Sequence, residues 1–471
     1  QATRGNRTDN TLRVQALPAA SKMLSILGVM IRTMSRRTLI FVCSFALSIC
    51  ALPSLAADPL VSIEKSVQLI NQDENSLARA YLAPALVDPR ISAIERSRAY
   101  YLRGFSFSSE GMPVSAARDF NRSIEFYPAN PMALFALARL YWDGAGVDQD
   151  YGLALTLFAQ AGELGHQDAD LFLALGRLYG RGVDQNIPLA RDLLIDLAEN
   201  GDARAMSHLA RSLRASPTGA VQAADWYRKA FTAGDANALV ALAFMHIGGE
   251  LTVSEPLSEA NRLLRQAAAA GSATAMVRLA HHYLAGTGVP KDYVESQALF
   301  LQASALGNAD ADVGLGYLYQ AELMPLSSDR SAAYWYERAA HAGNVEGQLR
   351  WARMLLDKGR SRQARDWFAA AARQDSIAAH NNLAWLLATL DDVELRDGKR
   401  ALAHASVAVE AEPSPAHLDT LAAAYAETGQ FDRAIVIQRE ALAALTPPDD
   451  SLRAGLERRL QGYRQAQLWR E

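Results

Sequence analysis

The residues of this chain that could do chemistry do not form a catalytic or metal-binding pattern. Nine histidines are scattered over 471 residues, and none has the spacing of a zinc-protease motif. His281 and His282 are adjacent, so they point to different sides of a helix and cannot easily share a metal ion. The sequence contains neither a Gly-x-Ser-x-Gly elbow nor an evident serine, histidine and acid set. We therefore predict no catalytic residue, no cofactor and no metal site.

One pattern of charged residues favours binding. Pairs of positions three residues apart are alternately basic and apolar along the chain, and such positions are neighbours on one helix face. The basic pairs are His208 with Arg211, Arg278 with His281, and Arg350 with Arg353; the intervening pairs are Phe172 with Leu175, Ala241 with Phe244, and Gly314 with Tyr317. A surface that alternates in this way suits an acidic or amphipathic peptide, or an anionic polymer.

The predicted partner-binding residues are His208, Arg211, Phe244, Arg278, His281, Tyr317, Arg350 and Arg353. The alternative interpretation is that these arginines pair with acidic neighbours on a solvated helix face, which is ordinary for arginine.

The elements that must position these residues repeat along the chain. A glycine recurs at intervals of 33 to 37 residues, at Gly165, Gly201, Gly234, Gly271, Gly307 and Gly343. Four residues after each glycine stands a small residue, and eight residues after it stands Leu or Trp. Small and large residues four apart indicate one face of a helix. Self-similarity at this period predicts stacked helical pairs, in which the glycine ends the second helix of each pair.

The second helix of each repeat carries a column of bulky residues. Eight and seven residues before the glycines stand Leu157-Phe158, Leu193-Leu194, Trp226-Tyr227, Leu263-Leu264, Leu299-Phe300 and Trp335-Tyr336. These side chains are expected to fill the space between neighbouring pairs, because a single pair cannot bury its whole apolar face.

The turn inside several repeats carries a Gly-x-Gly sequence followed by valine, as in Gly144 to Val147, Gly180 to Val183 and Gly286 to Val289. With these turns, the repeats at residues 131–374 resemble the Sel-one-like repeat, a variant of the tetratricopeptide repeat with a longer turn. Two turns depart from the pattern, one at Arg214 to Gly219 and one at Gln320 to Leu326. These departures concern the local curvature of the solenoid and leave the predicted fold unchanged.

Both flanks resemble ordinary tetratricopeptide repeats. Residues 57–130 contain one such repeat from Ser97 to Pro128, preceded by a degenerate leading pair, and residues 375–446 contain two more. Residues 447–471 are predicted to form a capping helix with Leu452, Leu456, Leu460 and Tyr463 on one face. The whole is an all-α fold, an α-solenoid of about ten helical pairs in a right-handed superhelix. In solenoids of this type the first helices line the concave surface.

The front of the chain resembles a secretory signal peptide at residues 34–56. Met34 is followed by Arg36-Arg37, an apolar run from Leu39 to Leu52, and Ser54-Leu55-Ala56. The run is too short to span a bilayer as a helix, so we expect cleavage after Ala56, with Ala57 as the alternative site. A twin-arginine signal is a further alternative, and a lipoprotein would use Cys50, although Ile49 stands where a small residue is needed. Residues 1–33 are interpreted as an upstream or non-native extension.

Cleavage would change both the thiol content and the charge of the protein. Both cysteines, Cys43 and Cys50, lie in the signal, so the mature chain would hold no disulfide and no thiolate metal site. The first 57 residues contain seven Lys or Arg and one Asp, which leaves 40 basic and 50 acidic residues. That balance argues against nucleic-acid binding.

Together these features predict a non-catalytic scaffold or adaptor of the cell envelope that binds a protein or peptide partner. We expect it in the periplasm, with a secreted form as the alternative. The resemblance implies protein interaction without naming the partner. Two alternatives stay open: a secreted hydrolase or cell-wall ligand binder, and a structural spacer of a polymer-export assembly.

Overall fold

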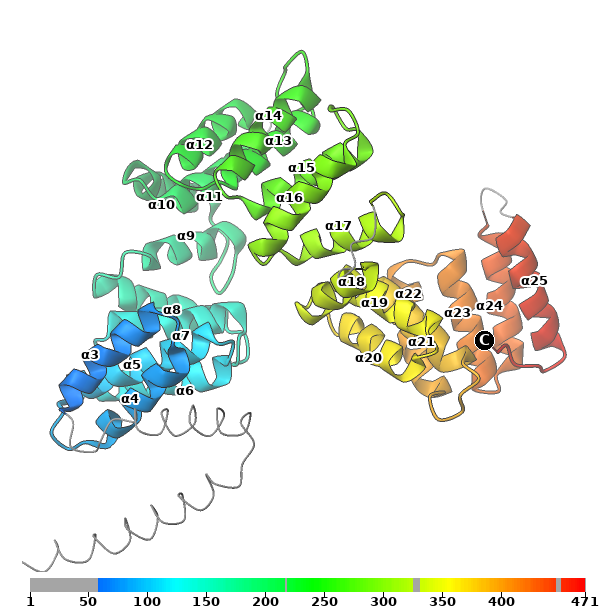
Figure 1. Ribbon diagram of the computed structural model, residues 1–471, viewed down its shortest axis with the longest axis horizontal. Helices are drawn as coiled ribbons and strands as arrows, with labels where there is room; N and C mark the ends of the chain where they lie inside the picture. Colours follow the sequence, from blue (N-terminus) through cyan, green and yellow to red (C-terminus); the bar gives the residue numbers. More distant parts are fainter. Residues whose placement is uncertain (1–57, 217, 325–330, 446–449, 471) are drawn as a thin grey trace, which may run out of the picture. The chain divides into compact units, whose positions relative to one another are not determined.

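The computed structural model describes residues 58–216, 218–324, 331–445 and 450–470 (Figure 1). The predicted extension at 1–33, the signal peptide at 34–56 and Pro447-Pro448 lie outside the described residues. The irregular stretch from Gln320 to Leu326 is described as far as residue 324.

Every regular element in the described part of the chain is an α-helix, so the predicted all-α solenoid is confirmed. The first helices of the successive pairs are α3 (Pro59–Asn71), α5 (Ala93–Ser109), α7 (Pro131–Asp143), α9 (Ala169–Tyr179), α11 (Ala203–Arg214), α13 (Ala238–Ile247), α15 (Ala273–Ala285), α17 (Ala309–Gln320), α19 (Val345–Asp357), α21 (Ile377–Thr389) and α23 (Pro415–Glu427). The second helices are α4 (Asn75–Val87), α6 (Pro113–Phe126), α8 (Tyr151–Glu163), α10 (Ile187–Glu199), α12 (Ala220–Thr232), α14 (Pro256–Ala269), α16 (Tyr293–Ala305), α18 (Ala332–His341), α20 (Ser361–Ala372), α22 (Gly398–Ala411) and α24 (Phe431–Ala443). The last helix is α25 (Asp450–Arg464).

The recurring glycines end the second helices, as predicted. Each of the six has a positive φ between 82° and 105°, which is the left-handed region that residues with a Cβ avoid. Four residues further on, Ala169, Ala205, Ala238, Ala275 and Ala311 are almost completely buried. The small side chains of this column allow the first helix of one pair to pack closely on the second helix of the preceding pair: a Cβ at Gly347, in the same column, would lie 2.5 Å from Ala339 of α18.

The bulky column of the second helices forms the core between repeats. Phe158, Leu194, Tyr227, Leu264, Phe300 and Tyr336 are each at most 2% exposed. Burial raises the pKa of Tyr336 to about 12, while its hydroxyl donates to Gln320 on α17 at 2.8 Å. The phenol therefore stays protonated and holds the first and second helices of its repeat together.

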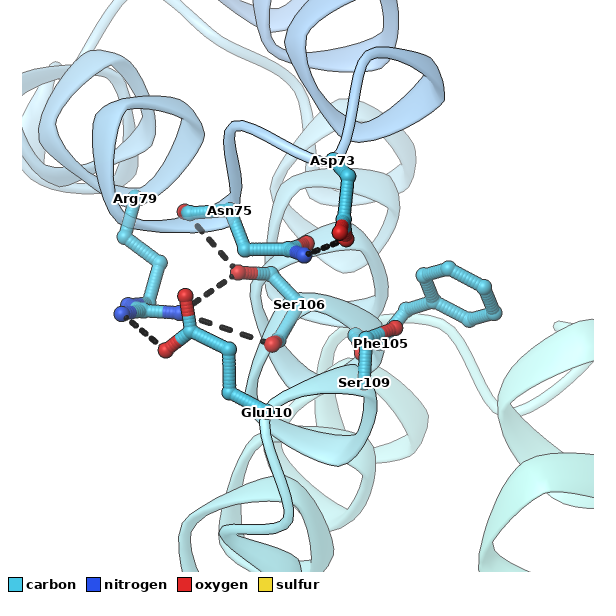
Figure 2. A network of polar contacts seen from close by, with 7 residues as sticks. All are labelled: Asp73, Asn75, Arg79, Phe105, Ser106, Ser109 and Glu110. Atoms are coloured by element: carbon cyan, nitrogen blue, oxygen red, sulfur yellow. Dashed lines mark hydrogen bonds and ion pairs between the residues drawn. The ribbon is translucent and has the colours of Figure 1, made fainter. Parts of the chain in front are cut away.

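The chain divides after Asp196 into two compact units, which we describe separately. In the first unit, a polar network joins the leading pair α3–α4 to α5 (Figure 2). The Arg79 guanidinium donates to the Ser106 hydroxyl at 2.8 Å and pairs with Glu110 at 2.7 Å. The Ser106 hydroxyl in turn donates to the carbonyl of Asn75 at 3.0 Å. These contacts fix α4 against the first tetratricopeptide-like repeat.

In the second unit, α25 packs along α24 at the end of the solenoid (Figure 1). Leu456, Leu460 and Tyr463 are buried on its inner face, as the sequence predicts. Burial raises the pKa of Tyr463 well above its usual range. Two residues of the following tail, Trp469 and Arg470, also reach the repeats: Arg470 pairs with Glu427 on α23 at 2.8 Å.

Candidate functional site

The structure brings together two of the predicted partner-binding residues, which lie on neighbouring first helices of the second unit. The Arg278 guanidinium of α15 lies over the Phe244 ring of α13, 5.2 Å from its centroid. Both side chains are exposed. The two helices are also linked at their starts, where the Ser272 hydroxyl bonds to the Asn237 side-chain oxygen at 2.6 Å. Phe244 and Arg278 thus form an exposed cation–π pair across a repeat boundary.

The predicted arginines differ in their partners. Arg350 pairs with Glu346 one turn away on α19, at 2.6 Å, as the alternative interpretation expects. Among the described residues, no carboxylate lies within ion-pair distance of Arg278 or Arg353, and both side chains are exposed. Tyr317 on α17 is 46% exposed. Arg278 and Arg353 are thus exposed cations without a carboxylate partner among the described residues, and Phe244 and Tyr317 present aromatic rings to solvent.

The predicted histidines are more closely packed than the sequence suggests. His208 on α11 is half-buried; burial, and secondly the charge of the exposed Arg211, lower its pKa to about 4. His281 on α15 packs edge-on against Phe300 at 5.1 Å between ring centroids, with part of its surface open to solvent. Partial desolvation and the charge of Arg278 lower the pKa of His281. Both histidines are neutral at pH 7, so the predicted surface owes its positive charge to arginine.

The prediction of surface positions for Phe172, Leu175 and Gly314 is wrong. Phe172 and Leu175 are buried, and the Phe172 ring stacks on Phe158 with 4.4 Å between centroids. A Cβ on Gly314 would lie 2.4 Å from the Phe300 ring. Phe172 and Gly314 belong to the core, because their helices turn an additional column toward the second helix of the preceding repeat. Leu173, eight residues after Gly165 on the face predicted from the repeat pattern, is half-exposed.

Sequence reasoning missed a pocket of about 510 Å³ in the second unit. Five helices line it: α19, α20, α21, α23 and α25. Its lining includes Arg353, Phe368, Asn381, Trp385, Asp419 and Arg459. Only Arg353 belongs to the predicted set. The sequence signal for this pocket is the polar pair Asn381-Asn382 close to Trp385, within the repeats predicted at residues 375–446.

The described residues contain no candidate metal cluster and no candidate membrane-spanning helix. No group of three or more potential ligands occurs among them. The nearest approach is His380 and His404, whose Nδ1 atoms lie 2.9 Å apart. His281 and His282 contact different helices, since His282 Nδ1 lies 2.6 Å from the Asn261 side-chain oxygen. Within the same residues no helix has both the length and the apolar character needed to cross a bilayer.

The Sel1 repeat model matches seven segments of the chain, at residues 131–166, 168–202, 216–235, 236–272, 273–308, 309–344 and 345–376. The predicted Sel-one-like repeats are thereby confirmed. The shortest match, 216–235, falls where the turn at Arg214 to Gly219 departs from the pattern.

Solved structures with a similar arrangement include three repeat proteins. Protein c5321, a protective antigen of uropathogenic Escherichia coli strains with an SLR fold, is 24% identical, with 80% of this chain and 81% of that chain covered and a TM-score of 0.45. A Sel1 repeat protein from Oxalobacter formigenes is 24% identical over 50% of this chain and 99% of its own, with a TM-score of 0.39. Yeast Tom70 is 16% identical, with 86% of this chain and 95% of that chain covered and a TM-score of 0.36. None of the curated proteins matches the chain.

Proposed function

The chain belongs to the Sel1 repeat family, and from that premise we propose that it is a non-catalytic scaffold that captures a protein partner on the first-helix face of its second unit. Sel1 and tetratricopeptide repeat folds are typically protein-interaction scaffolds and are generally not catalytic. Stacked repeats present a long, continuous surface, which suits an extended partner more than a small substrate.

The observation that carries this proposal is the exposed pair formed by Arg278 and Phe244. An arginine held over an aromatic ring keeps its outer N–H groups available, and Arg and aromatic residues are enriched at protein interfaces. Arg278 has no carboxylate partner among the described residues. An acidic side chain of the partner would supply the missing negative charge while an apolar group covers the Phe244 ring.

The proposed partner is a protein or peptide with acidic residues, and not a nucleic acid. After cleavage the chain would carry ten more acidic than basic residues, so its overall field repels a polyanion such as DNA. Local arginines can still select individual carboxylates, because such contacts act over a few ångströms.

We place the protein in the periplasm, on the evidence of the signal-like sequence at residues 34–56. The mature chain would contain no cysteine, which suits an oxidising compartment in which unpaired thiols react. A secreted form would carry the same sequence features.

Capture from an envelope extract of the source organism, with in-cell crosslinking, tests the scaffold. Three chains that start at Ala57 are compared: the native chain, the double variant with Phe244→Ala and Arg278→Glu, and the matched control Arg439→Glu. Arg439 is an exposed residue of the second helix α24. We expect a partner that the native chain and the control capture and that the double variant loses. Equal capture by all three chains would exclude this face as the binding site.

A further inference from the structure

The pocket of about 510 Å³ lies toward the C-terminal end of the second unit, where the last Sel1 segment, residues 345–376, meets the helices that follow it. This volume falls within the range of about 300–1,000 Å³ that is usual for ligand sites. The apolar part of its lining includes Phe368 and Leu386, which are buried, and the half-exposed Trp385. Such a lining can hold an aromatic or aliphatic side chain.

The ionised groups of the pocket leave it positively charged. Asp419 accepts hydrogen bonds from Arg459 Nε at 2.8 Å and from Gln438 at 2.7 Å, and Arg459 also pairs with it at 2.7 Å. The charge of Asp419 is therefore neutralised by Arg459. Arg353 remains at the rim, with no ion pair among the described residues. The pocket thus presents one cation that has no counter-charge of its own.

One buried polar atom of the pocket also lacks a partner. The side-chain oxygen of Asn381 is shielded from solvent and accepts no hydrogen bond within the described part of the chain. The hydroxyls of Thr389 and Thr420, by contrast, donate to the carbonyls of Trp385 and Ala416. A buried acceptor without a donor is costly, and a bound peptide could satisfy it only if the Asn381 side chain turned toward the cavity.

We propose that this pocket anchors an acidic segment of the partner protein, with one large apolar side chain inside the cavity and a neighbouring carboxylate on Arg353. The Trp385 ring, whose centroid lies 5.4 Å from the Arg459 guanidinium, packs against the apolar side chain of the partner. The inference rests on the proposed scaffold function and names a second contact for the same partner.

Fluorescence anisotropy with a defined peptide tests the pocket in the mature chain. The probe is an end-capped, fluorescein-labelled nonapeptide with one phenylalanine between two aspartates in a glycine–serine background. Ala416→Trp fills the pocket from an exposed position on α23, and Arg353→Glu reverses the rim charge. We expect each to weaken binding by about tenfold or more, as at the centre of an interface.

The matched controls are Ala443→Trp and Arg439→Glu, both at exposed positions of α24 outside the pocket. They should bind the probe like the native chain. A probe with lysines in place of the aspartates should bind at least about tenfold more weakly than the acidic probe. Equal binding of the two probes, equal binding by native and pocket variants, or no binding of the acidic probe would each overturn the proposal.

The capture and probe-binding experiments distinguish a pocket that does not bind the partner from a chain that is not a scaffold. Suppose that the native chain captures a partner, that the double variant with Phe244→Ala and Arg278→Glu loses it, and that both pocket variants still capture it. The scaffold proposal then stands, and the pocket is not an anchor for the partner. If the probe binds in the pocket but the native chain captures no partner, the pocket binds peptides and the scaffold proposal fails.

Discussion

Arg459 of α25 and Asp419 of α23 form a two-pronged contact in the interior of the second unit, with Nε to Oδ1 at 2.8 Å and Nη2 to Oδ2 at 2.7 Å. Both side chains are at most 10% exposed. The guanidinium also lies over the rings of Trp385 and Trp469, at 5.4 and 5.3 Å. The last helix and the tail are thereby attached to α21 and α23, which gives the pocket its rigid wall.

Asp419→Asn should release α25 from the solenoid. The variant leaves the Arg459 charge buried without a counter-ion, a change that costs about 3–5 kcal/mol in proteins. We expect faster amide hydrogen exchange in α25 and α23 while the Sel1 repeats keep their protection, because each repeat contacts only its neighbours. The control is Glu346→Gln, which removes the exposed pair with Arg350 and should cost at most about 1 kcal/mol. Similar exchange in both variants would show that the buried pair does not hold α25.

The stability of the repeat that contains α11 should fall between pH 7 and pH 5. The pKa of His208 is about 4 in the folded chain, against 6.5 for an ordinary histidine, because of burial and then the charge of Arg211; Arg204 acts in the same direction, and Asp202 and Asp235 oppose it. Between these two values the unfolded chain binds a proton that the folded chain does not, so acid favours unfolding. At pH 5 the proton bound by the unfolded chain lowers the free energy of unfolding by about 2 kcal/mol.

His208→Gln should reduce that loss, as measured by urea unfolding at pH 7 and pH 5 with circular dichroism. The matched control is His341→Gln at an exposed position of α18, which should leave the pH dependence close to that of the native chain. If His208→Gln and the native chain lose the same stability, His208 is not the group that titrates.

The register of the repeats could be predicted from the sequence because local rules dictate it. The left-handed conformation after a helix favours glycine, and close packing between helices favours alanine. Each repeat therefore has a glycine followed four residues later by a small residue, as at Gly271 and Ala275. Phe172 was misplaced because α9 is apolar on more than one face. The rings of Phe158, Phe135 and Trp142 around Phe172 decided its orientation, and such contacts between helices cannot be read from one helix.

The pocket could not be predicted for a related reason. Its lining comes from five helices between Arg353 and Arg459, and its members occupy no common position of the repeat. The pairing of Arg459 with Asp419 joins residues 40 positions apart, and only the folded chain shows that it neutralises Asp419 while Arg353 stays without a counter-charge. The sequence predicted a basic surface, but not which arginines are already paired.

Gly271→Ala should destabilise its repeat through backbone strain alone. Gly271 has a φ of +89°, and a Cβ there would meet no atom within 4 Å. The left-handed conformation costs a residue with a Cβ about 1–2 kcal/mol. The control is Gly152→Ala inside α8, where φ is not positive and the nearest contact is an ordinary 3.4 Å; this change should stabilise the helix by about 0.5–1 kcal/mol. Unfolding midpoints in urea compare the two, and a neutral Gly271→Ala would contradict the assigned role of the recurring glycines.

Processing of the precursor should produce a chain that begins at Ala57. Signal peptidases need small residues at the last and third-last positions of the signal, here Ala56 and Ser54. Ala56→Trp should therefore leave the full-length precursor in the membrane fraction, whereas Leu55→Phe, at the tolerant position between them, should be processed normally. Mass spectrometry of the chain expressed in its source organism measures the start. A first residue of Asp58 would move the site by one position, a lipid-modified start at Cys50 would establish a lipoprotein, and an unprocessed chain in the cytoplasm would contradict the proposed export.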